Sequence, residues 1–474
     1  MLKFFIVYFL IICTLFANDF SNSLYDLISE DDSIWSVDDN VKQNHLKLES
    51  SLNNTLKQKN VYSYEDLLDN IKTFAPKILL QKLETASSAA ELRSVRSELY
   101  PTFNLSLNEE YSKRYDDFPL RNTSVGNDSI IQSTGYQAYA SIGLNYNIFN
   151  FGSTLDKIDA YKAKIKSSKQ KECMVYKDVA LYLLDEYYKA MILKERLKYT
   201  NDLISNLTQI YENKKRLNEV GELPKSSIFE GALKIADESS NLSYIQKDIT
   251  QTLSNINYIT GSNISDINVL VYFRNVLNNT KFINFYETLK AKQLFYQIEE
   301  KRNLLNSEFK NYFPSLSLYA RYNFYGYDRN DIIESIDKAE KNGYKFGLVI
   351  SYTLFDGFRR ESRIENAKIE YLKSNLELVD AKREYEQNIK SLQENINQEQ
   401  NKISNLANSK DYSKNILNIA NRLNKSGEEN LNNVIESINL DMRKNIELIQ
   451  SKIKLDMLKV KKDIISSDKL CDGI

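Results

Sequence analysis

Residues 216–222 read Arg-Leu-Asn-Glu-Val-Gly-Glu, and residues 422–428 read Arg-Leu-Asn-Lys-Ser-Gly-Glu. The two stretches share Arg, Leu, Asn, Gly and Glu at a constant offset of 206 residues. Three further pairs keep this offset: Tyr146 with Tyr352, Phe149 with Phe355, and Glu230 with Glu436. Such recurrence at one spacing indicates that the chain is a duplicated unit.

Each copy shows the same order of parts. A first helix is expected over about residues 65–99 and again over about 282–312. Pro101 and Pro314 mark the ends of these helices, because proline lacks an N–H group and forces the preceding residue toward extended geometry. Two strands, a long helix, a glycine turn and another helix follow. The predicted divisions are a first copy at 61–280 and a second copy at 281–465, with a C-terminal tail at 466–474.

Four segments alternate between apolar and polar residues, at about 101–111, 136–149, 314–325 and 344–355. A period of two gives a strand one apolar and one polar face. Each segment has the length of a tilted strand that crosses a bilayer, with aromatic residues near its ends. Four strands cannot close a membrane barrel, and open edges are not tolerated in lipid. Several copies must therefore share one barrel, and a trimer would supply three times as many strands.

The stretches 153–220 and 359–426 contain neither glycine nor proline. Apolar residues recur there at three- and four-residue steps, with lysine and glutamate between them. This pattern is typical of long coiled-coil helices with a solvated charged face, each able to span about 100 Å. The sequence thus predicts a mixed α and β membrane protein with a long helical coiled-coil barrel and a transmembrane β-barrel shared between copies.

Glycine turns stand at the far ends of the long helices. Gly221 and Gly427 can take the left-handed conformation that ends a helix. Pro224 suits the first turn of the next helix, and Glu428 and Glu429 suit a helix N-terminus. We therefore expect two antiparallel helical hairpins whose tips lie far from the strands.

The N-terminus is the one strongly apolar segment. Lys3 precedes the apolar run 4–16, and Ala17 precedes polar sequence, so residues 1–17 are expected to be a secretory signal peptide. Residues 18–60 form a polar extension to which no role is assigned. With Cys173 and Cys471 as the only cysteines after this segment, packing rather than disulfides should stabilise the fold, and Cys173 is expected to act as a small apolar residue.

The composition excludes several functional classes. The net charge of −1 offers no basic excess for nucleic acid. The single histidine, His45, lies in the polar extension, so no metal site, catalytic triad or cofactor site is predicted.

These features together resemble the TolC-like outer membrane factors, over about residues 65–463. The resemblance rests on the strand openings at 100–103 and 313–316, the strand endings at 147–152 and 353–357, and the two glycine tips. It implies a homotrimer in the lipid of the bacterial outer membrane, with a helical tunnel in the periplasm. A periplasmic adaptor and an inner-membrane transporter would complete an export system, and the chain itself would not be an enzyme.

The resemblance also implies site residues. The adaptor would meet the tips, at Val220, Gly221, Glu222, Leu223, Ser426, Gly427 and Glu428. Ser426 stands where the family usually has valine. The pore constriction would fall on Asn433 and Glu436, where a ring of carboxylates would attract cations. Asn433 lacks the family's acid, so cation blockage is less firmly implied, and Glu436 can also be read as a solvated helix residue.

Two other interpretations compete with this one. An exported coiled-coil protein without a pore would explain the long helices but not four bilayer-length strands at matched places. A periplasmic hydrolase with paired carboxylates would need a convergent acidic motif, which the sequence lacks. Within the channel interpretation, the exported substrate stays open, as does the choice between a proton-driven pump and an ATP-driven exporter as partner.

Overall fold

The computed structural model describes residues 61–113, 134–272, 283–339 and 341–466. The expected signal peptide, the polar extension, His45 and Cys471 lie outside these residues. None of the helices in the described ranges combines the length and the apolar character needed to cross a membrane.

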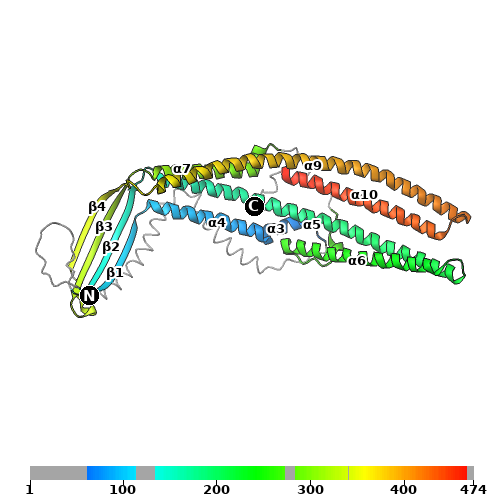
Figure 1. Ribbon diagram of the computed structural model, residues 1–474, viewed down its shortest axis with the longest axis horizontal. Coiled ribbons are helices and arrows are strands. Elements are labelled where there is room, and N and C mark those ends of the chain that lie inside the picture. Colours follow the sequence, from blue (N-terminus) through cyan, green and yellow to red (C-terminus); the bar gives the residue numbers. More distant parts are fainter. Residues whose placement is uncertain (1–60, 114–133, 273–282, 340, 467–474) are drawn as a thin grey trace. The chain divides into compact units, whose positions relative to one another are not determined.

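Four antiparallel strands form one sheet in the order β1-β2-β3-β4 (Figure 1). Their bounds are β1 Thr102–Ser112, β2 Gly135–Phe149, β3 Ser315–Asp328 and β4 Lys341–Ser351. The register aligns Leu105, Ile142, Tyr322 and Tyr344 in one row across the sheet. Because side chains alternate along each strand, Leu107, Leu144, Phe346 and Ile350 lie on the same face as this row.

This apolar face is open in the single chain. The side chains of Leu105, Phe346 and Ile350 are 57%, 73% and 75% exposed. An apolar face of this extent is unfavourable in water, and it calls for lipid or protein against it. The opposite face carries Asn104, Ser106, Asn145, Ser317, Arg321 and Lys345.

Strand β4 ends at Ser351, before the expected end at Phe355. Ser351 pairs with Ser315, and the next residue along β3 would be Pro314, which has no N–H group for the ladder. Leu354 and Phe355 therefore lie outside the sheet, where they are 86% and 73% exposed.

The helices are α3 Tyr64–Phe74, α4 Pro76–Arg96, α5 Ser153–Glu219, α6 Lys225–Thr260, α7 Leu289–Lys310, α8 Ile332–Asp337, α9 Arg359–Ser426 and α10 Leu431–Ser466. The sequence pattern predicts one helix over about residues 65–99. The structure breaks it at Ala75, whose φ of −68° and ψ of 115° are extended. Pro76 causes the break, because its ring disfavours helical geometry in the residue before it. The six-residue helix α8 was not predicted.

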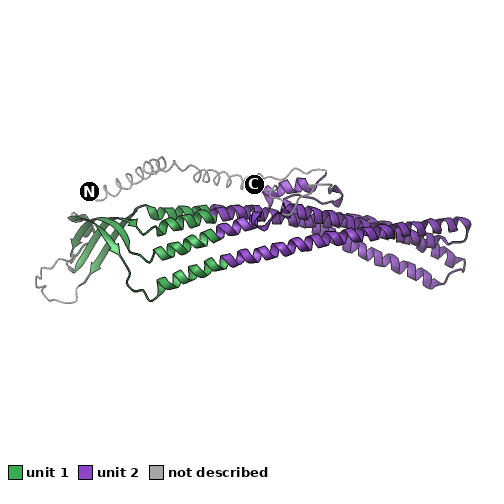
Figure 2. Ribbon diagram, turned by 90° about the horizontal axis from the view of Figure 1, so that it is seen from above, with its two compact units in different colours: residues 1–46, 88–164, 298–373 green, residues 47–87, 165–297, 374–474 purple. Residues whose placement is uncertain are grey.

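The chain divides into two compact units, and each draws on both sequence copies (Figure 2). One unit holds the sheet with the adjoining parts of α4, α5, α7 and α9, and the other holds the remaining parts of these helices with α3, α6 and α10. The sequence repeat is therefore not a division into two separate domains, because α5 and α9 each run through both units.

Tyrosines stabilise the core of the second unit. The Tyr64 hydroxyl donates to the carbonyl of Ala180 at 2.8 Å, and the Tyr187 hydroxyl donates to the carbonyl of Val271. Both rings are fully buried, and they meet edge to face with centroids 5.8 Å apart. Each hydroxyl thus has a partner in an apolar core, which avoids the cost of a buried unpaired polar group.

Cys173 is disulfide-bonded, and its partner lies outside the described residues. Its side chain is buried in α5, as expected of a small apolar residue, but the disulfide was not expected. Two cysteines far apart in a sequence give no local signal that they are paired.

Candidate functional site: the helical tips and the polar face of the sheet

The two tips have the same backbone geometry. Gly221 and Gly427 have φ values of 83° and 81°, in the left-handed region that favours glycine. The amide of Glu222 donates to the carbonyl of Leu217 at 2.8 Å, and that of Glu428 donates to Leu423 at 2.9 Å. This backward bond closes each helix in the manner of a Schellman motif. The repeat read from the sequence is thus also a repeat of hydrogen bonds.

An asparagine closes each tip, a role that was not predicted from the sequence. The Asn218 side-chain amide donates to the carbonyl of Leu223 at 2.6 Å. Its counterpart Asn424 donates to the carbonyl of Glu429 at 2.8 Å. The signal was present in the sequence, because both asparagines belong to the repeated stretch. Each one ties the end of one helix to the segment that leads into the next.

The following helices begin later than expected. Pro224 is the N-cap residue of α6 rather than a residue of its first turn. α10 begins at Leu431, so Glu428 and Glu429 precede the helix and no acid lies in its first turn. Instead, the Asn430 side chain accepts a bond from the amide of Asn432 at 2.9 Å. Asparagine is a preferred N-cap residue, which explains the later start.

Glu436 lies on the exposed surface of α10 in the single chain. Its counterpart in the first copy, Glu230, forms an ion pair with Lys214 at 3.9 Å. The residue that corresponds to Lys214 is Ala420, so the second copy has no lysine there. No ion pair to Glu436 occurs among the described residues, and its carboxylate stays available to ions.

Asn433, the other residue expected at the constriction, lies one helical turn before Glu436 and is also exposed. Its amide donates to the carboxylate of Glu429, the residue that precedes the cap of α10. Because a primary amide carries no net charge, Asn433 orients an acid without adding one of its own. The structure thus brings Glu429, Asn433 and Glu436 to one end of α10.

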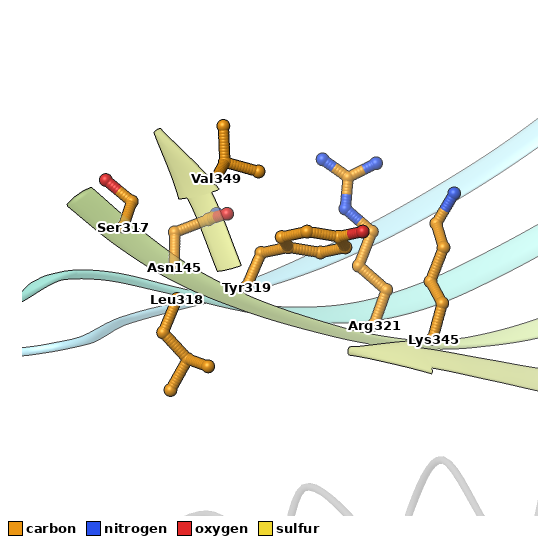
Figure 3. A pocket seen from close by; sticks show the side chains of 7 residues that line it. All are labelled: Asn145, Ser317, Leu318, Tyr319, Arg321, Lys345 and Val349. Carbon is orange, nitrogen blue, oxygen red and sulfur yellow. The ribbon is translucent and has the colours of Figure 1, made fainter. Parts of the chain in front are cut away.

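The polar face of the sheet has a shallow hollow lined by side chains from β2, β3 and β4 (Figure 3). The side chains of Asn145, Ser317, Tyr319, Arg321 and Lys345 project to the same side of the sheet, and Leu318 points to the other. Arg321 and Lys345 are register partners on adjacent strands. Like charges placed directly opposite across a sheet repel one another, so this row carries positive charge at an energetic cost.

Two glycines give the long side chains of this face room to lie along the wall. A Cβ on Gly347 would meet the ring of Tyr319 at 3.1 Å, and one on Gly143 would lie 3.7 Å from Cγ of Arg321. The tyrosine ring and the start of the arginine side chain therefore rest over backbone. The Tyr319 ring therefore leans on the sheet, whereas the charged ends of Arg321 and Lys345 project from it (Figure 3).

In the part of the chain that the structure describes, no group of three or more histidine, cysteine, aspartate or glutamate side chains is placed to hold a metal ion. The hollow of Figure 3 is open to solvent and has both polar and apolar residues in its lining.

The model of the outer membrane efflux protein family matches residues 67–262 and 294–436. The chain belongs to the outer membrane efflux protein family. It is also similar to the outer membrane protein TolC of Vibrio cholerae, with 20% identity over 339 residues, which cover 70% of this chain and 74% of that protein.

Solved structures of similar fold include outer membrane proteins and channels. The Campylobacter jejuni channel CmeC matches with a TM-score of 0.70 and 16% identity, over 87% of this chain and 86% of CmeC. VceC of Vibrio cholerae matches with a TM-score of 0.68 and 11% identity, over 85% of this chain and 96% of VceC. The open-state Neisseria gonorrhoeae channel MtrE matches with a TM-score of 0.67 and 10% identity, over 85% of this chain and 88% of MtrE.

Family membership indicates where the sheet and the long helices lie in the cell envelope. The chain is an outer membrane channel protein with a helical tunnel in the periplasm. The exposed apolar face of the sheet is then the face toward lipid, and the polar face of Figure 3 lines the pore.

Proposed function

We propose that three copies of this chain form the exit duct of a tripartite efflux or type I secretion system. The observation that carries this proposal is the four-stranded sheet, which has an exposed apolar face and two edge strands, β1 and β4. An open edge cannot remain unpaired in lipid. Pairing β1 of one copy with β4 of the next satisfies both edges and closes a barrel.

The tips are the proposed contact with a periplasmic adaptor, at Val220, Gly221, Glu222, Leu223, Ser426, Gly427 and Glu428. Three observations support this. Both tip glycines have no atom within 4 Å of the position of an added Cβ, so the turns are open. Val220 is 70% exposed at the first tip. The matched hydrogen bonds at the two turns present two similar surfaces to a partner.

The proposed constriction lies at Glu436, with Asn433 beside it. In a trimer, three copies of an unpaired carboxylate would meet near the axis, where they would attract cations and repel one another. Asn433 contributes no charge, so the selectivity would depend on Glu436. Ala420 in place of a lysine supports this assignment, because it leaves Glu436 without the ion pair that its counterpart Glu230 has.

The chain acts as a passive conduit in this proposal, with no catalytic step of its own. A partner transporter in the inner membrane supplies energy and selects the substrate. An exported coiled-coil protein without a pore is not favoured, since it would leave the apolar face of the sheet without a function.

The test is single-channel conductance of the purified protein in planar bilayers, with Glu436→Gln beside the wild type. We expect a steady conductance with cation preference, and a lower cation preference in the variant. Glu230→Gln is the matched control, because that carboxylate is already paired with Lys214, and it should change the selectivity little. A channel that Glu436→Gln leaves unchanged contradicts the constriction, and a protein that never conducts contradicts the duct.

A further inference from the structure

Helix α8 connects β3 to β4 and lies against the apolar face of the sheet. The Ser335 hydroxyl donates to the carboxylate of Glu109 at 2.8 Å, and Glu109 shares its face with Leu105 and Leu107 by alternation along β1. A Cβ on Gly326 would lie only 1.9 Å from the carbonyl oxygen of Ser335. The backbone of α8 therefore rests directly on Gly326, which a larger residue would not allow.

Hydrogen bonds and ion pairs fix this helix in place. The Asp331 side chain accepts bonds from the amides of Ile333 and Glu334 and so caps the helix. The Lys338 ammonium group binds the carboxylate of Glu334 at 2.8 Å and also that of Asp328 at the end of β3. α8 is thus an ordered element that belongs to the rim of the sheet.

The exposed surface of α8 carries three isoleucines beside Glu334 and Asp337. Ile332, Ile333 and Ile336 are 47%, 63% and 37% exposed, whereas Ser335 is fully buried against the sheet. Exposing three isoleucine side chains of a six-residue helix to water is unfavourable in free energy. The arrangement is inverted relative to a helix that packs its apolar side on a protein core.

These isoleucines continue the apolar face of the sheet, whose exposed members are Phe103, Leu105, Leu107, Tyr344, Phe346, Leu348 and Ile350. That face is toward lipid in an outer membrane channel. The β3–β4 connection lies at the opposite end of the strands from their junctions with α7 and α9 (Figure 1). Since the long helices are periplasmic, α8 lies at the cell-surface side.

We propose that α8 is an interfacial anchor whose three isoleucines insert among the acyl chains at the outer boundary of the membrane. The partner is lipid, because the apolar surface of α8 is continuous with the lipid-facing surface of the sheet. The ion pairs of Lys338 then lie at the level of the polar headgroups, where charged groups are well solvated. This anchor would set how deeply the barrel sits in the bilayer. It does not depend on the adaptor contact or on the constriction.

The test uses tryptophan fluorescence, because the chain has a single tryptophan, Trp35. In the full-length protein with Trp35→Phe, Ile333→Trp is compared with Asp337→Trp after reconstitution in phosphatidylcholine vesicles that contain acyl-brominated lipid. We expect bromolipid to quench at least half of the Ile333→Trp emission and aqueous iodide to quench little of it. The exposed Asp337 position should show the opposite preference. Strong iodide quenching at Ile333→Trp, or quenching by neither agent, would overturn the proposal.

A second variant tests the placement of the helix on the sheet. Gly326→Val should displace α8, since its side chain would collide with the backbone of Ser335. In the Ile333→Trp reporter we expect it to reduce bromolipid quenching at least twofold, while single-channel conductance shows that the barrel still forms. Unchanged quenching in a conducting channel would contradict the placement of α8 that the anchor requires.

Discussion

The Glu230 carboxylate lies 3.9 Å from the ammonium group of Lys214, whereas the equivalent acid of the second copy, Glu436, has Ala420 in the position of that lysine. Two otherwise similar hairpin tips therefore differ in charge. One tip carries a partly neutralised acid, and the other carries an acid open to ions. The difference arose at a single buried position of α9, and it can be reversed there.

Ala420→Lys should restore the missing ion pair. Lys214 occupies the same place in the first copy with a side chain that is 20% exposed, so a lysine can extend from this position toward the surface. We expect the variant to lower the cation preference of the channel, measured as a reversal potential in a salt gradient. Ala420→Met, whose side chain is of similar length but uncharged, should leave the cation preference unchanged. An equal shift in both variants would point to altered packing of the tip instead of charge.

Asn218→Ala and Asn424→Ala should each loosen one tip. Each removes a side-chain bond to a backbone carbonyl, which is worth about 0.5–1.5 kcal/mol. We expect faster amide hydrogen exchange in the turn next to the altered residue, with no change in the sheet. Asn421→Ala, at an exposed position of α9, is the control and should leave the exchange of both tips unchanged. If Asn421→Ala speeds amide exchange in the turns as much as the other two variants do, the side-chain bonds of Asn218 and Asn424 do not stabilise the turns.

Arg321→Gln should shift the ion preference of the pore toward cations. The positive row formed with Lys345 lines the polar face of the sheet, and removing one charge per chain lowers the local anion concentration. The reversal potential in a salt gradient measures the shift, which should shrink at high ionic strength because salt screens the interaction. Ser106→Ala on the same face serves as a neutral control. No shift at low salt would mean that this row does not face the ion path.

Glu300→Gln should stabilise the protein at neutral pH but not in acid. Burial raises the pKa of Glu300 above its ordinary value of 4.5, with Lys301 and Lys164 acting in the opposite direction. The folded state therefore binds the proton more tightly than the unfolded chain, and this contribution to stability is lost as the pH rises through the raised pKa. Thermal unfolding at pH 7 and pH 4 should show a higher Tm for the variant only at pH 7.

The control for that experiment is Glu370→Gln. The Glu370 side chain is 51% exposed on α9, and its partner Lys373 lies one turn away. Exposed pairs of this kind contribute little to stability. We expect no rise in Tm at either pH. A rise at pH 7 equal to that of Glu300→Gln would show that removal of any carboxylate has this effect.

The sequence predicted the parts of the fold that repeat or alternate. All four strands follow from period-two patterns, and both hairpin turns follow from the repeated glycines. The family match and the solved channels confirm the mixed helical and β-barrel class. The placement of the tip contacts and of the constriction stays a prediction.

Features set by a single residue or by contacts distant in sequence were missed. Pro76 ends α3 at Phe74, although the residues on both sides of the break have a helical pattern. The Ile-Ile-Glu-Ser-Ile-Asp stretch of α8 is too short to show a helical period, and its position depends on Gly326 in a neighbouring strand. The asparagines at the tips were visible as repeats, but their bonds require the folded turn.

The glycines beneath Tyr319 and Arg321 have a consequence for the size of what can pass. Where a pore is narrowed by side chains that stand into it, its bore changes each time a rotamer changes. Here the tyrosine ring lies over Gly347, and the arginine side chain begins along Gly143. The wall therefore lies close to the backbone beside Tyr319, whereas the charged ends of Arg321 and Lys345 extend from it (Figure 3). A duct built in this way is widened beside Tyr319 by the absence of a side chain on Gly347, and it meets a passing solute with positive charge at the next row.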